Sequence, residues 1–215
     1  RAILTRQRTQ LSNAIRGHTA EFGLVAPVGR NGLEMLIAII ADAADKRVPI
    51  DARAALQMLI AQLRLVNEQI LESDRQIIAS ARSTEVGRRL MGIPCVGPLL
   101  ASALVAAVAD PKSFRSGRNL AAWIGLVPRQ NSSGGKERLG GITKQGDRYL
   151  RQLLVVGAVA VIRYAQRHGA RRPWLVQLLA RRTPKIAAVA LANKNARMAW
   201  AIMTSGECYR EPVAA

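Results

Sequence analysis

A run of apolar residues with a seven-residue repeat constrains the fold of this chain more than any other feature. Four of them are each seven positions apart: Leu56, Leu63, Ile70 and Ile77. Leu59 and Val66 fill the intermediate positions of a 3-4 heptad pattern, and this pattern predicts a long amphipathic helix. Two interpretations stay open. The helix packs within its own domain, or it forms a coiled-coil seam that pairs two chains through residues 56–80.

The composition predicts that the remainder is helical as well. Of the 215 residues, 49% are hydrophobic and only 4% are aromatic, which favours helices over a β-sandwich or barrel. No segment shows a strand signal of any strength. We therefore predict an all-α protein: a helical, coiled-coil-like region over 1–87, a compact helical domain over 88–205, and a tail over 206–215. A basic break is expected at 168–173. On the last helix we expect Lys194, Asn195 and Arg197 to lie on the surface.

The charge of the chain is concentrated in its second half. The net charge is +18, of which residues 1–110 contribute +3 from 13 basic and 10 acidic residues. Residues 111–215 contribute +15 from 19 basic and 4 acidic residues. A half this basic predicts a polyanionic partner, most simply nucleic acid.

Membrane and metal-binding classes are poorly supported by the sequence. The longest apolar runs, 96–109 and 153–162, are shorter than the ~18–20 residues that span a bilayer, so we expect no membrane partner. The two cysteines are 113 positions apart and the two histidines lack partner spacing, so neither a zinc site nor a disulfide framework is indicated. A reduced cytosolic setting fits this pattern.

Residues 92–98 (GIPCVGP) form a compact turn between two predicted helices. This turn resembles the hairpin of helix-hairpin-helix DNA-binding modules, in which glycines allow close approach and backbone N–H groups face a phosphate. Gly92, Val96 and Gly97 are the candidate contacts. Such contacts position DNA without reading its sequence. The alternative is a plain turn between helices.

The segment 129–142 is a polar, glycine-rich loop that has the ingredients for nucleophilic chemistry on DNA. It contains Ser132 and Ser133, and five candidate phosphate contacts lie in it or close behind it: Lys136, Arg138, Lys144, Arg148 and Arg151. A serine can attack a phosphodiester when cations neutralise the developing charge. The alternative is a flexible linker whose neighbouring cations only bind phosphate. A serine-hydrolase triad is not indicated, and residues 111–205 contain only two acids, Glu137 and Asp147, too few for a metal nuclease site.

Several motifs in fixed order resemble one known family. They are the turn at 92–98, the segment 114–128 with its RNLAAWIGLVP run, and the segment 132–151 with SSGGK, ITK, GD and YLR. Together they are similar to the C-terminal domain of the insertion-sequence transposases related to the Piv DNA invertase. The resemblance is strong over residues 88–170 and extends more weakly to 1–87.

The resemblance implies a catalytic serine that forms a covalent link to DNA. The matching position is Ser133, with Ser132 as the possible neighbour. It also implies an N-terminal RuvC-like domain whose four acids bind Mg²⁺, and no residues here match those acids. We therefore expect no cofactor in this chain, and Mg²⁺ only in the absent domain.

The resulting expectation is a transposase fragment for DNA transposition and site-specific recombination, inactive without the absent domain. Whether the chain is itself an enzyme is left open. The expected partners are DNA, an element-encoded structured RNA and a second copy of the chain, and the expected location is the bacterial cytoplasm at the nucleoid. The alternative is a non-catalytic nucleic-acid-binding protein that uses the same hairpin turn and basic helix.

Overall fold

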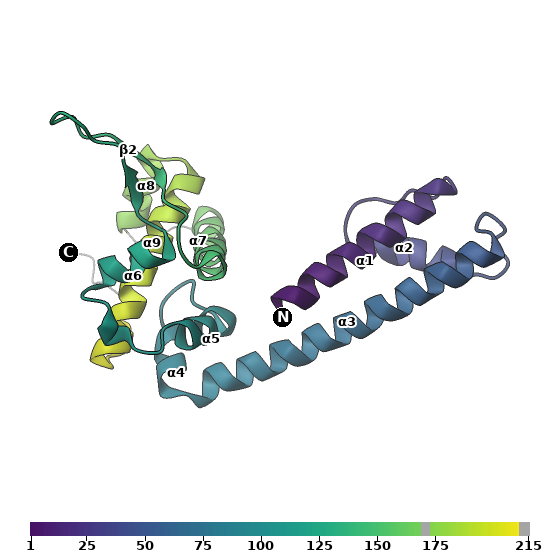
Figure 1. Ribbon diagram of the computed structural model, residues 1–215, viewed down its shortest axis with the longest axis horizontal. Coiled ribbons are helices and arrows are strands. Elements are labelled where there is room, and N and C mark those ends of the chain that lie inside the picture. The colour runs from purple at the N-terminus through teal and green to yellow at the C-terminus, as the bar shows by residue number, and fades with distance from the viewer. Residues whose placement is uncertain (169–172, 211–215) are drawn as a thin grey trace. The chain divides into compact units, whose positions relative to one another are not determined.

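The computed structural model describes residues 1–168 and 173–210, and α-helices make up most of them (Figure 1). The predicted all-α class is confirmed, with one small two-stranded sheet added. The chain divides into two compact units, Arg1–Gln76 and Ile77–Ala215. The expected basic break at 168–173 falls largely on residues 169–172, and the expected tail on 206–215 includes 211–215; both of these stretches lie outside the described residues.

The first unit is a three-helix packing of α1 (Ala2–Glu21), α2 (Arg30–Ala41) and the first part of α3 (Ile50–Ser83). Its core includes Ile15 of α1, Leu36 and Ile40 of α2, and the heptad residues Leu56 and Leu63, all at most 3% exposed. These two heptad positions therefore pack inside their own unit, as the first of the two open interpretations expects.

Two arginines of the first unit are used to hold the backbone together. Arg53 is 9% exposed and donates to the carbonyls of Ile40 (2.6 Å) and Ile39 (3.3 Å) at the C-terminal end of α2. Arg16 donates to the carbonyls of Pro27 (3.0 Å) and Gly29 (2.7 Å) in the connection between α1 and α2. The last carbonyls of a helix lack partners within it, and Arg53 satisfies them at the end of α2, whereas Arg16 satisfies carbonyls of the connection.

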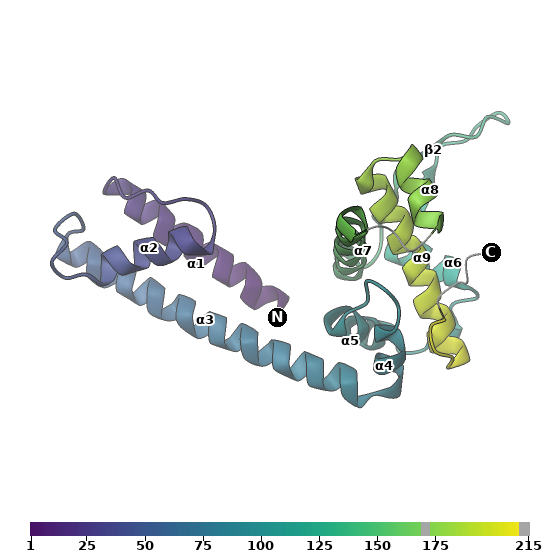
Figure 2. The ribbon, with the colours of Figure 1, turned by 180° about the vertical axis from the view of Figure 1, so that it is seen from behind.

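The second unit contains six α-helices among the described residues. They are α4 (Glu85–Met91), α5 (Pro98–Ala107), α6 (Gly117–Ile124), α7 (Arg148–His168), α8 (Pro173–Arg181) and α9 (Pro184–Ser205), with a 3-10 turn η1 (Pro111–Ser113) before α6. Figure 2 shows α9 running between α7 and α6. Small buried residues make this possible, since Ala188, Ala192, Ala196 and Ala199 are at most 1% exposed. Leu120, Ile124, Leu150 and Leu154 complete the contact from α6 and α7.

The predicted irregular loop at 129–142 is instead a β-hairpin, and the prediction that the chain has no strand is wrong here. Strand β1 (Pro128–Gln130) pairs antiparallel with β2 (Leu139–Ile142), with an irregular register between Pro128 and Gln130. Almost every residue of both strands is exposed, so the sequence lacks the alternation of apolar and polar residues that predicts a strand. The hairpin extends away from the helices of its unit (Figure 1).

A helix that crosses a bilayer must be both long and apolar. Within residues 1–168 and 173–210, no helix combines sufficient length with sufficient apolar character to cross a membrane.

Candidate active site and nucleic-acid interface

The tip of the hairpin is a two-residue turn formed by Gly134 and Gly135. Their φ angles are +56° and +74°, a combination that a type I′ turn requires and that side chains with a Cβ rarely adopt. Lys136 closes the turn by donating its N–H to the carbonyl of Ser133 at 3.1 Å, and the two residues form an antiparallel bridge. Side chains directly opposite one another in such a pair lie on the same face of the ladder, which makes Lys136 the cross-strand neighbour of Ser133.

The two adjacent serines have different hydrogen-bonding situations. The hydroxyl oxygen of Ser132 accepts from the Arg138 N–H (3.0 Å) and from Nε2 of Gln130 (3.2 Å). These bonds tie Ser132 to the body of the hairpin. Ser133 is exposed, and among the described residues its hydroxyl has no hydrogen-bond partner. Of the two hydroxyls, the one at the turn is therefore available to an incoming molecule.

The base of the hairpin is anchored to the C-terminal end of α6. Gly125 ends α6 with φ of +82°, and Gly146 has φ of +86°. A Cβ on Gly146 would come within 1.7 Å of the Trp123 carbonyl oxygen, and one on Gly125 within 2.0 Å of the Gln145 carbonyl oxygen. Only glycine allows this approach of the two backbones. The N–H of Lys144 donates to the Gly125 carbonyl at 3.2 Å and adds to the anchor.

Four of the five predicted phosphate contacts have exposed side chains: Lys136, Arg138, Lys144 and Arg148. The ion pairs within the described residues involve none of these four. Unpaired, exposed cations are free to contact phosphates. The fifth residue, Arg151, is half-buried and has a different situation. Its Nη1 donates to the Ile124 carbonyl (2.8 Å) and the Gln145 carbonyl (3.3 Å), so it caps α6 and fixes the hairpin base.

The turn between α4 and α5 offers fewer contacts than its sequence suggests. Val96 is 5% exposed, and its N–H donates to the Ile93 carbonyl at 3.0 Å. The Gly92 N–H donates to the Arg89 carbonyl at 3.1 Å. Gly97 precedes α5, and its N–H has no partner in the described part of the chain, so it is the one of the three candidates with a free donor.

The inner side of this turn is packed into the unit. Nδ2 of the buried Asn195 donates to the Pro94 carbonyl at 3.0 Å. A Cβ on Gly157 of α7 would come within 2.4 Å of the Cys95 carbonyl oxygen. The expectation that Asn195 lies on the surface is wrong, because its side chain holds the turn against α9. The turn therefore has a structural role, whatever its outer face contacts.

A bound metal ion needs several His, Cys, Asp or Glu side chains that converge on one point. Among residues 1–168 and 173–210, no group of three or more His, Cys, Asp or Glu side chains could hold a metal ion. Asp147 serves as a helix cap, since its carboxylate accepts from the Leu150 N–H at 2.9 Å. Asp147 therefore has a structural role at the start of α7.

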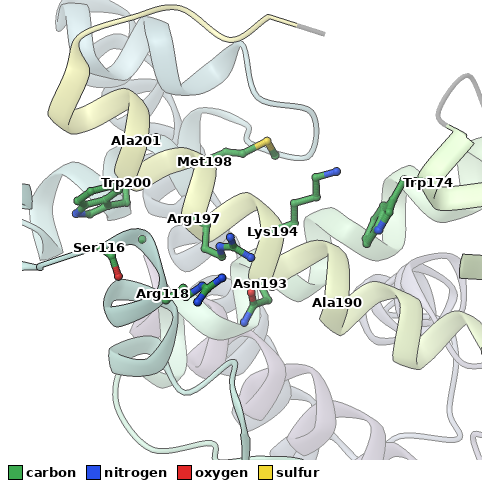
Figure 3. A pocket seen from close by; sticks show the side chains of 11 residues that line it. Ser116, Arg118, Trp174, Ala190, Asn193, Lys194, Arg197, Met198, Trp200 and Ala201 are labelled. Carbon is green, nitrogen blue, oxygen red and sulfur yellow. The ribbon is translucent and has the colours of Figure 1, made fainter. Parts of the chain in front are cut away.

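A second group of cations lies outside the predicted site. Arg118, Lys194 and Arg197 line a pocket between the start of α6 and the middle of α9 (Figure 3). Sequence reasoning treated Lys194 and Arg197 only as a polar helix surface. The signal that could have found them is their spacing of three residues on one helix, which brings both to one side of α9.

Comparisons with known proteins find similarity to insertion-sequence transposases. Residues 87–172 match the family model described as Transposase IS116/IS110/IS902 family. The "Putative transposase y4pF/y4sB" of Sinorhizobium fredii is 46% identical over 213 residues. The "Probable family 20 transposase" of Pseudomonas aeruginosa is 44% identical over 212 residues. The "Transposase for insertion sequence element IS1111A" of Coxiella burnetii is 41% identical over 209 residues.

Each match covers nearly all of this chain but only part of the relative. They cover 98%, 98% and 96% of this chain but only 54%, 63% and 57% of the three relatives. The chain thus spans roughly half to two thirds of the length of the curated relatives that it matches. Its similarity to insertion-sequence transposases, expected from the motifs within residues 88–170, is supported over nearly its whole length.

Proposed function

We propose that this chain is the part of an insertion-sequence transposase that binds DNA and supplies, in Ser133, the nucleophile for strand transfer. The observation that carries the proposal is the difference between the two serines. Ser132 is bound within the hairpin, whereas Ser133 is exposed at a tight turn with a free hydroxyl. The match of residues 87–172 to a transposase family model supports the same role.

The proposed step is a transesterification at phosphorus. The Ser133 Oγ attacks a DNA phosphodiester, a new Oγ–P bond forms, and the P–O bond to one deoxyribose breaks. The serine hydroxyl gives up its proton to water, and the departing deoxyribose oxygen takes up a proton to become a hydroxyl. One phosphodiester replaces another, so the strand can be rejoined without ATP by the reverse attack. Negative charge builds up on the non-bridging oxygens, and cations nearby stabilise it.

Lys136 is the residue best situated to supply that stabilisation. It is the cross-strand neighbour of Ser133 and forms no ion pair with any described carboxylate. The carbonyl of Arg138 accepts from the Asn131 N–H at 2.8 Å, and Arg138 lies two residues after Lys136 on the same arm of the hairpin, just before β2. Lys144 and Arg148 extend the cationic surface toward α7, where the net positive charge of the second half of the chain attracts the DNA backbone.

A second copy of the chain is part of the proposal, through residues 56–80 of α3. Leu56 and Leu63 are used inside their own unit, but Met58 and Leu65, seven residues apart, are 67% and 54% exposed. Each lies two positions after a buried heptad residue, on nearly the opposite face of the helix, and exposed apolar side chains on that outer face are a suitable surface for self-association. Sedimentation of the wild-type chain and of Met58→Glu/Leu65→Glu tests it, and a monomeric wild-type chain would contradict it.

A structured RNA and a metal-binding domain elsewhere in the longer protein complete the proposal that the family resemblance suggests. The net charge of +15 on residues 111–215 supports an RNA partner, since this charge suits either nucleic acid. No step is assigned to Mg²⁺ within this chain, because its described acids do not form a site.

The proposal is tested by strand exchange in a chimera, in which this chain replaces the matching 213-residue segment of the Sinorhizobium relative. We expect Ser133→Ala to abolish strand exchange while DNA binding stays within about twofold of the parent. Ser132→Ala, the matched control, keeps measurable exchange. Equal exchange by the parent and by Ser133→Ala would contradict the proposal and favour a purely nucleic-acid-binding role.

A further inference from the structure

The pocket between α6 and α9 is a cavity of about 750 Å³ in the second unit, away from the serine hairpin. It lies at the N-terminal end of α6, whereas the hairpin leaves the C-terminal end of that helix. Eight residues of α-helix separate the two ends, a distance of about 12 Å. The pocket and the hairpin can therefore be changed independently by mutation.

The charges that line this pocket are all positive. Arg118 comes from α6, and Lys194 and Arg197 come from α9, and none of the described carboxylates forms an ion pair with them. Figure 3 shows the guanidinium groups of Arg118 and Arg197 close to one another, with Asn193 beside them. Like charges that share a site repel, and a bound anion removes that repulsion.

The backbone of the pocket fixes this arrangement of cations. A Cβ on Gly117 would lie 3.0 Å from both the Cα and the carbonyl oxygen of Arg197, so the absence of a side chain sets how closely α6 approaches α9. Nδ2 of Asn193 donates to the Leu126 carbonyl at 3.0 Å, which ties α9 to the end of α6. The cations therefore sit on two helices locked together, not on loops.

Two tryptophans form the apolar walls. Nε1 of Trp200 donates to the Pro111 carbonyl at 2.9 Å, which holds its ring against η1. The Lys194 ammonium lies 4.4 Å from the centre of the Trp174 ring, a cation–π contact that keeps the ammonium at the pocket. Packed tryptophans beside cations lower the local water content and strengthen the attraction for an anion.

We propose that this pocket binds a phosphate of a nucleic-acid backbone, as a second contact site in addition to the serine hairpin. Three donors from two helices, with no acidic neighbour in the pocket, match the repeated charge of a phosphodiester chain. Arg118 and Arg197 contact the phosphate oxygens, and Trp174 acts as a positioning residue for Lys194. Both single-stranded DNA and RNA present this chemistry.

The test measures binding of fluorescein-labelled DNA and RNA oligonucleotides to the chain by fluorescence anisotropy over a range of salt concentrations. The pocket variant is Arg118→Gln/Arg197→Gln. The matched control is Arg163→Gln/Arg167→Gln, which removes the same charge from exposed positions of α7 in the same unit. Each lost phosphate contact lowers the slope of log affinity against log salt by about 0.7–0.9.

We expect the pocket variant to lose on the order of tenfold in affinity and about 1.4–1.8 in salt slope. The control variant should lose clearly less. A larger loss on RNA than on DNA, or the reverse, identifies which backbone the pocket binds. Equal losses for pocket and control variants would overturn the proposal, as would unchanged binding by both. Tight binding of inorganic phosphate without an effect on oligonucleotide affinity would also overturn it.

Two further measurements keep this result independent of folding and of the catalytic proposal. Circular dichroism should show the same melting for pocket variant and parent, because Arg118 and Arg197 are exposed and form no ion pair. Trp174→Leu should weaken binding less than the double arginine change, since it acts only through Lys194. Oligonucleotide binding is measured without any strand exchange, so a failure of the strand-exchange test leaves the pocket result intact.

Discussion

Lys136 and Ser133 face one another across the two-residue turn of an exposed hairpin, joined by a 3.1 Å hydrogen bond from the Lys136 N–H to the Ser133 carbonyl. This pairing brings a cation beside a serine whose hydroxyl is free. The relationship depends on two glycines with positive φ, and not on burial, because every residue of the segment 131–141 is exposed. The turn backbone is therefore the feature to perturb first.

Alanine at Gly134 or Gly135 should loosen the hairpin tip without unfolding the unit. A residue with a Cβ in the left-handed conformation raises the free energy of the closed turn by about 1–2 kcal/mol. The population of the open turn therefore rises by a factor of roughly 5–30. Hydrogen exchange of the Lys136 amide should accelerate by that factor while the melting temperature of the unit is unchanged. Gly141→Ala is the control, since its Cβ would meet nothing within 4 Å and its φ is not in the left-handed region. Unchanged exchange in the Gly134 and Gly135 variants would contradict the turn assignment.

Substitutions of Arg151 and Arg148 should affect different properties, thermal stability for Arg151 and DNA binding for Arg148. Arg151→Gln removes two hydrogen bonds to backbone carbonyls at the end of α6 and should cost about 1.5–3 kcal/mol, a fall in Tm of roughly 5–10 °C. Arg148→Gln removes an exposed cation from the first turn of α7, where a positive charge opposes the helix dipole. It should leave Tm within about 1 °C of the parent and weaken DNA binding.

Thermal melting and anisotropy on the two variants together check this division. If Arg148→Gln lowered Tm as much as Arg151→Gln, the distinction between a capping arginine and a phosphate-contacting one would be wrong.

Alanine in place of one glycine in each unit should change the stability of that unit in opposite directions. Gly157→Ala introduces a Cβ 2.4 Å from the Cys95 carbonyl oxygen, so α7 must move away from the turn between α4 and α5, at a cost of about 1–3 kcal/mol. Gly17→Ala adds a methyl group to the interior of α1 with nothing within 4 Å, and should stabilise the first unit by about 0.5–1 kcal/mol. Calorimetry on both variants gives the two signs, and a stabilised Gly157→Ala would refute the packing described for the turn.

The sequence predicted the helices well because their apolar periodicity reflects burial. Leu56 and Leu63 are buried as the heptad requires, and the all-α class follows from many such segments. The pattern could not decide whether the seam pairs within the chain or between chains, since both solutions bury the same residues.

The hairpin was missed because its strands carry no burial signal. Both strands are short and exposed on both faces, and their pairing is set by the Gly134–Gly135 turn instead of by a core. Asn195 was wrongly expected on the surface because it is polar. The side-chain amide of Asn195 donates to the Pro94 carbonyl inside the unit. This is a tertiary contact, and no local sequence pattern predicts it. The neighbouring residues made Ser133 and Ser132 candidates, and the choice of Ser133 stays a prediction. The hydrogen bonds that distinguish the two hydroxyls could not be predicted from the sequence, because they depend on the pairing of the hairpin.

Peptide mass spectrometry of a trapped protein–DNA adduct tests directly whether Ser133 is the nucleophile. The chimera with the Sinorhizobium relative is incubated with a nicked DNA substrate that prevents religation, then digested with protease and nuclease. If Ser133 is the nucleophile, a nucleotide-modified peptide forms whose added mass maps to Ser133, and it is present in Ser132→Ala and absent in Ser133→Ala. An adduct that maps to Ser132 or to any other residue, or strand exchange that proceeds with no adduct, would contradict this role of Ser133.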